Sequence, residues 1–254
     1  MEEEEINIEE VRRQRGCMGE EEPNAKQIYQ VKRIVIDAGH GGMDGGALGY
    51  AGKLKEKDVA LDIARRVARI LSGNRSLNVL MTRKSDHYIS LKYRTDFANA
   101  RNADLFVSIH CNSNPHSLAT GTETYVYSSK ASNKVAAVAA VRENAGEDTS
   151  NILSALTHRI YNGLSFLLAQ EVERRIRDRL GLSIRRVQQA PFYVLARVDM
   201  PSILIETAFL SNRSEETKMA DPAWRDKIAQ AIADGIFAYK ERVEASIENR
   251  EARR

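Results

Sequence analysis

Apolar residues recur along the chain in two alternating patterns, which predict strands and helices in turn. Short runs rich in β-branched residues indicate strands, which we expect at Arg33–Asp37, Leu77–Thr82, Asp104–His110, Thr122–Tyr127, Pro191–Leu195 and Ile203–Glu206. Stretches in which apolar residues return every three or four positions indicate amphipathic helices, which we expect at Lys57–Leu71, Leu91–Arg101 and Pro222–Glu244. This alternation predicts a single α/β domain with a mostly parallel, twisted sheet of about six strands, flanked by helices.

The segment Lys130–Asp148 breaks this alternation. Ser132 is expected to cap a helix over Val135–Asn144, which Gly146 would end. The following stretch, Asn151–Leu180, predicts one long helix or two shorter ones. We therefore expect a helical insertion over residues 130–165 within a domain that spans residues 31–245.

Both ends of the chain differ from this domain in composition. Residues 1–30 are polar and charged, which predicts a tail or linker with one short helix near Ile8–Arg15. Residues 246–254 form a charged tail. No export signal is visible, because Met1 leads into a run of four glutamates.

Composition narrows the class of protein. Among the 254 residues, 43% are hydrophobic, which allows a sizeable core. No apolar run approaches the roughly 18 residues that span a membrane. The 38 basic and 35 acidic residues give a net charge of +3, so nucleic acid is not the expected partner. We interpret the basic stretch Arg174–Arg186 as a solvated helix face, and we expect a monomer.

Candidate chemistry gathers where three predicted strands end. His40 follows the first strand in a glycine-rich loop, His110 closes the third, and Glu206 closes the last. Glu56 stands where the first helix begins, a position that favours a carboxylate. In open α/β sheets, functional residues gather beyond the carboxyl ends of the strands, so these four side chains are expected to converge.

Two histidines and a carboxylate form a known catalytic zinc set that leaves one position for water. A second carboxylate can take a proton from that water and pass it to a leaving amine. The pattern therefore indicates metal-assisted amide hydrolysis, with His40, Glu56 and His110 as ligands and Glu206 as the base. Each residue taken alone also has a structural explanation. Cys111 is expected on the opposite strand face, as a buried thiol.

Four blocks, in order and spacing from about Arg33 to Lys240, resemble the zinc-dependent N-acetylmuramoyl-L-alanine amidases. They are Ile36–Ala47, Glu56–Leu61, Ala103–His110 and Pro201–Asn212. The resemblance implies Zn²⁺ on His40, Glu56 and His110, a catalytic Glu206, and a phosphorylase/hydrolase-like fold. It also implies cleavage of the amide between N-acetylmuramic acid and L-alanine in peptidoglycan, in the periplasm.

The insertion resembles that of the cell-separation amidases of Gram-negative bacteria. In those enzymes a helix covers the zinc site until a LytM-like activator displaces it at the division septum. The resemblance implies that Val141–Ala145 lies on this helix, and our hypothesis is that Glu143 occupies the open metal position. We further expect Val135, Val138 and Val141 to dock on the domain in the closed state and to offer a partner surface in the open state.

Two other functions remain open at this point. A zinc peptidase that cuts within the stem peptide would use the same ligands, since the ligand set does not define which amide is cut. A degenerate domain that binds peptidoglycan without cutting it is the non-enzymatic alternative.

Overall fold

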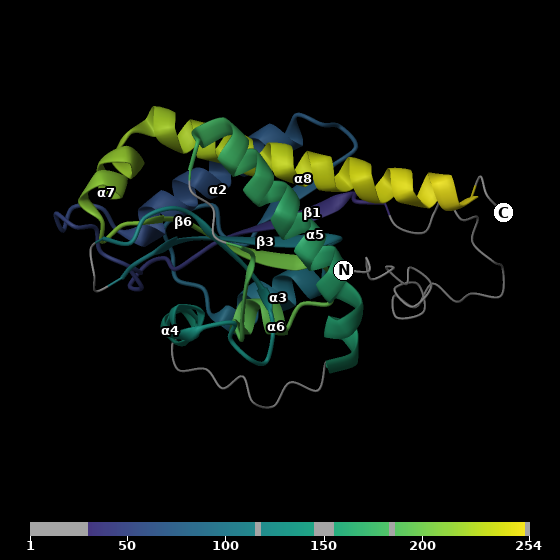
Figure 1. Ribbon diagram of the computed structural model, residues 1–254, viewed down its shortest axis with the longest axis horizontal. Helices are drawn as coiled ribbons and strands as arrows, with labels where there is room; N and C mark the ends of the chain where they lie inside the picture. Colours follow the sequence, from purple (N-terminus) through teal and green to yellow (C-terminus); the bar gives the residue numbers. More distant parts are fainter. Residues whose placement is uncertain (1–29, 115–117, 145–154, 183–185, 252–254) are drawn as a thin grey trace.

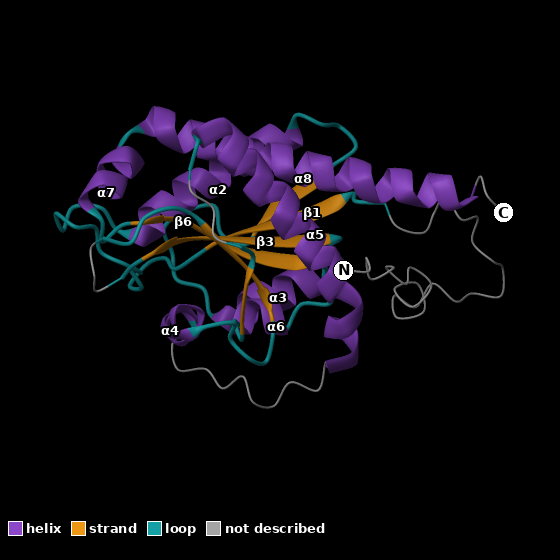
Figure 2. Cartoon of the chain, viewed as in Figure 1, coloured by secondary structure: helices purple, strands orange, loops and turns teal. Residues whose placement is uncertain are grey.

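A six-stranded sheet runs through the centre of the domain between layers of helices (Figure 2). The computed structural model describes residues 30–114, 118–144, 155–182 and 186–251. The strand order is β2-β1-β3-β6-β4-β5, and only the β4–β6 pair is antiparallel. The strands are β1 (Arg33–Ala38), β2 (Asn78–Met81), β3 (Leu105–Asn112), β4 (Glu123–Tyr127), β5 (Gln188–Ala190) and β6 (Ser202–Phe209). The predicted α/β class and mostly parallel sheet are confirmed.

Helices cover both faces of the sheet (Figure 1). Three of them, α2, α5 and α8, pack on the larger core, and α3, α4 and α6 lie on the opposite side. The helices are α2 (Glu56–Ser72), α3 (Leu91–Asn99), α4 (Lys134–Glu143), α5 (Ala155–Leu180), α6 (Tyr193–Ala196), α7 (Arg213–Ala220) and α8 (Pro222–Glu251). Among the described residues, none of these helices is long and apolar enough to cross a membrane.

Strand alternation directs the functional side chains toward the thinner helical layer. In β3, Val107 and Ile109 pack into the core beneath α2, α5 and α8, whereas Phe106 packs into the core on the other side. Because side chains alternate along a strand, His110 shares the face of Phe106. The same alternation in β6 places Glu206 on this face. The two residues are paired across the β3–β6 ladder.

The predicted strand Pro191–Leu195 is wrong. The edge strand β5 ends before it, at Ala190, and α6 begins at Tyr193. Proline has no backbone N–H for a ladder, so Pro191 favours the end of a strand. The side chain of Asn144 then fixes the turn, because its Nδ2 donates to the Pro191 carbonyl and its Oδ1 accepts from the Tyr193 N–H, each at 2.8 Å.

The insertion differs from expectation at the start of its first helix. Asn133 caps α4 by accepting from the Ala136 N–H at 2.9 Å, whereas Ser132, the predicted cap, donates its hydroxyl to Gln188. The expected stop at Gly146 lies outside the described residues, as does the proposed helix at Ile8–Arg15. From Ala155 to Leu180 the segment forms one helix, which agrees with the first of the two alternatives expected for it.

Two further differences concern the C-terminal third. The last helix runs from Pro222 to Glu251, beyond the expected end at Glu244. The short helix α7 was not predicted, because its sequence is polar and lacks apolar periodicity. A capping signal is nevertheless present, since Asn212 Oδ1 accepts from the N–H groups of Ser214 and Glu215.

A buried ion pair supports the loop that carries His40. Asp37 is fully buried and accepts from Arg94 at 2.8 Å, from the Thr82 hydroxyl at 2.6 Å and from the Ser108 hydroxyl at 2.8 Å. Burial alone would raise the pKa of Asp37, but the Arg94 guanidinium and these hydroxyls hold it below its usual range. The carboxylate is therefore charged and satisfied.

Two arginines also hold the backbone that leads into this loop. Arg94 donates to the carbonyls of Ala38 and His40 at 2.6 and 2.8 Å, and Arg83 donates to those of Ala38 and Gly39 at 2.9 and 2.6 Å. His40 has a φ of +58°, which costs energy for a residue with a Cβ. These carbonyl contacts stabilise that conformation.

Replacing Arg94 with methionine is expected to lower the free energy of unfolding by about 3–5 kcal/mol, because it leaves Asp37 buried without its charged partner. Urea denaturation measures this loss. The double variant Arg94→Met/Asp37→Asn should recover part of it, since the uncompensated charge is then removed.

Lys92→Met is the matched control, because Lys92 lies on the same helix and pairs with Asp96 at the surface. This variant should change the free energy of unfolding little, because ion pairs between exposed side chains contribute little to stability. An equal loss in the Lys92 and Arg94 variants would contradict a special role for the buried pair.

Candidate metal centre

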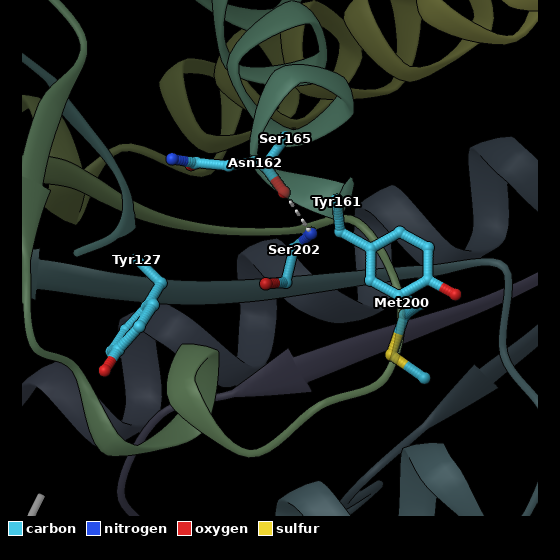
Figure 3. Close-up of a pocket in the computed structure, with 6 residues that line it drawn as sticks. All are labelled: Tyr127, Tyr161, Asn162, Ser165, Met200 and Ser202. Carbon is cyan, nitrogen blue, oxygen red and sulfur yellow. Dashed lines mark hydrogen bonds between the residues drawn. The ribbon is translucent and has the colours of Figure 1, made fainter. Parts of the chain in front are cut away.

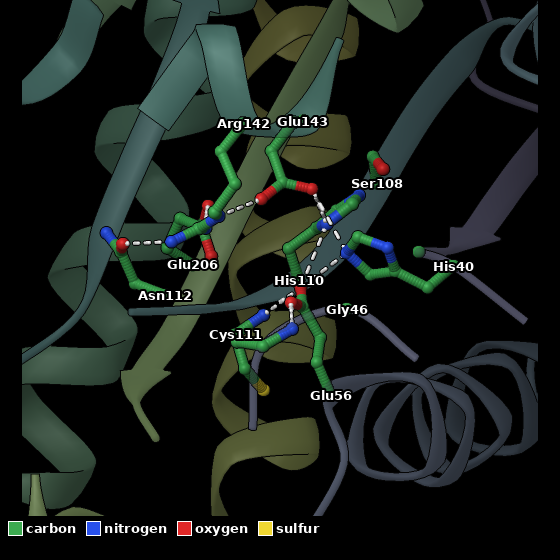
Figure 4. Close-up of polar contacts among 12 residues, drawn as sticks. His40, Gly46, Glu56, Ser108, His110, Cys111, Asn112, Arg142, Glu143 and Glu206 are labelled. Atoms are coloured by element: carbon green, nitrogen blue, oxygen red, sulfur yellow. Dashed lines mark hydrogen bonds and ion pairs between the residues drawn. The ribbon is translucent and has the colours of Figure 1, made fainter. Parts of the chain in front are cut away.

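Four side chains from separate parts of the chain meet at the carboxyl ends of β1 and β3 (Figure 4). They are His40 after β1, Glu56 at the start of α2, His110 in β3 and Glu143 at the end of α4. Glu56 Oε1 lies 3.1 Å from both His40 Nε2 and His110 Nδ1. Glu143 Oε2 lies 3.1 Å from the first of these nitrogens and 2.9 Å from the second.

The donor set is one that zinc accepts in proteins, since two imidazole nitrogens and two carboxylate oxygens are among its usual ligands. Each carboxylate oxygen lies 2.9–3.1 Å from both imidazole nitrogens, and all four donor atoms lie within 4.8 Å of one another. Within the described part of the chain, His40 Nε2 and Glu143 Oε2 are also buried without a hydrogen-bond partner. A bound cation would satisfy both atoms.

Neighbouring groups orient these donors. His40 Nδ1 lies 2.9 Å from Asp44 Oδ2, which leaves Nε2 free to face the cluster. Glu56 accepts from the backbone N–H groups of Ala47 and Cys111, each at 2.8 Å. Gly39 is required beside them, because a Cβ at that position would lie 2.4 Å from the His110 ring. These contacts orient the ligand atoms toward one another.

The electrostatics of the cluster favour positive charge. Burial would lower the pKa of both imidazoles, but the two glutamates raise the pKa of His40 to about 12 and that of His110 to about 9. The same cations lower the pKa of Glu56 to about 2, against its burial and the neighbouring Glu143. A site that draws protons so strongly also attracts a metal cation, which competes with them.

Glu206 lies beside this cluster and is fully buried. Burial raises its pKa to about 8, with Glu143 and Glu56 adding to the effect and Arg142 opposing it. Its Oε1 accepts from Arg142 at 3.2 Å, and among the described residues its Oε2 has no hydrogen-bond partner. A carboxyl group with this pKa can accept and release a proton near neutral pH.

The structure brings together all five residues singled out from the sequence, and it adds Arg142. This arginine donates to Glu143, Glu206 and Asn112. Adjacent residues on a helix project in different directions, so sequence spacing gave no reason to pair Arg142 with its neighbour. The only available signal was a long cationic side chain next to a candidate ligand. Glu143 itself is 6% exposed, so its side chain lies inside the protein and not in solvent.

The predicted docking face of α4 is wrong. Val135, Val138 and Val141 are 39%, 62% and 75% exposed, and the helix packs through Ala136, Ala139, Ala140 and Glu143 instead. Small side chains let the helix approach the sheet closely enough for Glu143 to reach the histidines. The three valines face outward.

Two other features do not compete with this centre. A cavity of about 10 Å³, lined by residues such as Tyr161, Ser165 and Ser202, has room for about one water and contains none of the cluster (Figure 3). Cys111 points into the larger core, as predicted, and burial raises its pKa well above the usual value. A buried neutral thiol is neither a nucleophile nor a ligand.

Comparison with known proteins gives the family. Residues 34–238 match the family model described as N-acetylmuramoyl-L-alanine amidase. The chain belongs to this amidase family. AmiA of Escherichia coli K12 is 35% identical over 236 residues, which cover 87% of this chain and 80% of AmiA. LytC of Bacillus subtilis is 38% identical over 206 residues, or 81% of this chain and 35% of LytC. The predicted enzyme class is thereby confirmed.

Solved amidases share the fold. AmiC2 of Nostoc punctiforme is 33% identical with a TM-score of 0.66, and the match covers 83% of this chain and 98% of AmiC2. The CwlD amidase of Clostridioides difficile, solved in complex with the GerS lipoprotein, is 27% identical with a TM-score of 0.65 and is matched over 98% of its length, against 82% of this chain. The single amidase domain described by the structure therefore has the architecture of its family.

Zinc is expected to stabilise the chain, because an ion that binds only the folded state raises its stability by about 2.7 kcal/mol at 100 times the dissociation constant. The melting temperature, measured with zinc and again after a chelator, tests this. His110→Ala should lose most of the shift.

His87→Ala provides the matched histidine control, since His87 lies in an exposed loop and is absent from the cluster. This variant should keep the full zinc-dependent shift. Equal shifts in the two histidine variants would place the ion elsewhere.

Proposed function

We propose that the chain is a zinc-dependent amidase that cuts the bond between N-acetylmuramic acid and L-alanine in peptidoglycan and is held inactive by α4. The observation that carries this proposal is the shared position of Glu56 and Glu143, each about 3 Å from the same two imidazole nitrogens. In this assignment His40, Glu56 and His110 hold the metal, Glu206 is the catalytic base, and Glu143 is the inhibitor.

Zinc supplies a Lewis acid that polarises the substrate carbonyl and makes water more acidic. Glu206 takes a proton from the attacking water and delivers it to the leaving nitrogen. Glu206 is paired with His110 across the β3–β6 ladder, which places its carboxyl group beside the metal donors for this transfer.

Inhibition follows from the chemistry of the open position. A catalytic zinc site needs one position for water or substrate, and the Glu143 carboxylate takes that position in the closed arrangement. Arg142 adds to the block by engaging Glu206. Two consecutive residues of α4 thus block both catalytic groups: Glu143 blocks the metal, and Arg142 blocks the base.

The docking of α4 suits a reversible switch. The buried apolar contacts of α4 come from alanines, which gain little free energy from burial. Polar contacts from its C-terminal end to the domain therefore supply much of the stability of its docking. A partner that binds the released helix shifts the equilibrium by its differential affinity for the two states. We propose that a LytM-like activator acts in this way in the periplasm, during daughter-cell separation, on a monomeric amidase.

Replacing Glu143 with alanine is expected to raise turnover of purified peptidoglycan by about 10-fold or more, since a charge-assisted contact is worth about 1.5–3 kcal/mol. Release of soluble fragments by the zinc-loaded chain measures it. Val141→Ala is the control, because Val141 lies on the outer face of the same helix. A folded, zinc-loaded Glu143 variant with unchanged turnover would contradict the inhibition.

Mass spectrometry of the fragments distinguishes the candidate reactions. Stem peptides that begin with L-alanine, together with peptide-free glycan, are the expected products. Shortened peptides still attached to muramic acid would show a peptidase. No products from the Glu143 variant would favour a binding module. Glu206→Gln in the activated background should lower turnover by about 10²- to 10⁴-fold.

A further inference from the structure

We propose that Arg142 and Glu143 imitate the two charged groups that amide hydrolysis produces, and that the contacts of Arg142 mark the binding site of the released amine. This inference rests on the proposed function. It assigns Asn112, the Ser113 carbonyl and Glu206 to a subsite for the amino terminus of the stem peptide.

The guanidinium of Arg142 contacts three acceptors next to the metal donors. Two of the residues that supply them, Asn112 and Glu206, are seen beside Arg142 in Figure 4. Its Nη1 donates to Asn112 Oδ1 at 3.1 Å and to the Ser113 carbonyl at 3.0 Å. Its Nη2 donates to Glu206 Oε1 at 3.2 Å. An ammonium group has three donors and no acceptor, so it can satisfy the same three oxygens.

The subsite is built by residues outside α4. Asn112 is buried, and its Nδ2 donates to Glu123 Oε2 at 2.8 Å. The hydroxyl of Tyr125 donates to the same oxygen at 2.7 Å. Because the amide nitrogen must face this carboxylate, the amide oxygen of Asn112 is directed toward Arg142. These contacts belong to β3 and β4, so they are independent of whether α4 stays in place.

Hydrolysis of the amide produces one carboxylate and one ammonium group, the same two charges that Glu143 and Arg142 carry. Water adds to the carbonyl carbon, the carbon–nitrogen bond breaks, and both protons of the water end on the nitrogen. The products are a lactyl carboxylate and an alanyl ammonium. Glu143 places its carboxylate against His40 and His110, and Arg142 places its cation against Glu206, with Arg142 Nε 2.6 Å from Glu143 Oε1. The two side chains therefore reproduce a product pair just after bond cleavage.

Binding of the peptide product should depend on its free amine. A peptide with a free alanine amine should bind the vacated subsite, and the same peptide with an acetylated amine should not, because acetylation removes the charge and two donors. Substrate carries this nitrogen as a neutral amide, so the subsite recognises the leaving group most strongly after cleavage.

The experiment uses the zinc-loaded Arg142→Ala/Glu143→Ala variant and the dipeptide L-alanyl-γ-D-glutamate. Isothermal titration calorimetry compares the free dipeptide with its N-acetyl form. A charged hydrogen-bonded contact predicts a preference of about 10-fold or more for the free amine. The parent chain, with α4 in place, should bind both forms more weakly than the double variant does.

Asn112→Ala in the same background tests the assignment of the subsite. It should reduce the preference for the free amine while zinc affinity, measured by chelator competition, stays unchanged, because Asn112 is not a metal donor. The melting temperature verifies that this variant folds. Arg142→Lys in the full chain is a second measure, since an ammonium at this place should still protect the subsite against the dipeptide.

Two failures can be told apart. Equal affinity of the free and acetylated dipeptides for the double variant, in a sample that still hydrolyses peptidoglycan, would overturn the product mimicry and leave the amidase function intact. A double variant that binds zinc, prefers the free amine and hydrolyses nothing would contradict the proposed function instead.

Discussion

The concentration of buried negative charge at the carboxyl ends of β1, β3 and β6 determines the rest of the structure. Asp37, Glu56, Glu143 and Glu206 are all buried within this region. Unpaired buried charge is costly, so each carboxylate requires cations or donors close by. Asp37 is neutralised by Arg94, Glu206 by Arg142, and Glu56 with Glu143 by the two histidines. A metal ion would add positive charge to the cluster of Glu56, Glu143 and the two histidines, where positive charge is favoured.

This constraint also fits the proposed release of α4. At the charged end of α4, Arg142 pairs with Glu206 and Glu143 contacts the histidines. The apolar side chains that α4 buries are all alanines. Asn144, directly after the helix, fixes the turn between β5 and α6. Release of α4 would therefore lose polar contacts that water and substrate can replace. An inhibitory element with a large hydrophobic face would have been much harder to displace.

Sequence patterns predicted the parts of the fold that depend on local periodicity. The β-branched runs gave β1, β3 and β6 because these strands are buried on both faces, and the chemistry at their ends gave His40, Glu56, His110 and Glu206 as candidates. The edge strand β5 is three residues long and has no such pattern, so its neighbour Pro191–Leu195 was chosen wrongly. Polar α7 was missed for the same reason.

The hydrophobic pattern of α4 could not predict which of its faces is buried. A helix rich in alanine and valine is apolar on most sides, and larger valines are the usual choice for a buried face. Close approach to the metal donors instead required Ala136, Ala139 and Ala140 inside. The role of Arg142 was equally hidden, because it depends on where Asn112 and Glu206 lie in three dimensions. The buried face of α4 and the role of Arg142 both depend on contacts between distant parts of the chain, which composition does not reveal.

Product mimicry links the proposed switch to the proposed reaction by a single equilibrium. Substrate and the closed helix cannot occupy the metal and amine positions together, so any group that binds there favours the open state. An activator that binds the released helix favours the same state from the other side. By linkage, each then strengthens the binding of the other by the same factor. Arg142 and Glu143 resemble the charged products and not the neutral amide of the substrate. Substrate can therefore displace α4 only with the help of contacts that it makes away from these two charges. An activator is needed when those contacts alone are too weak.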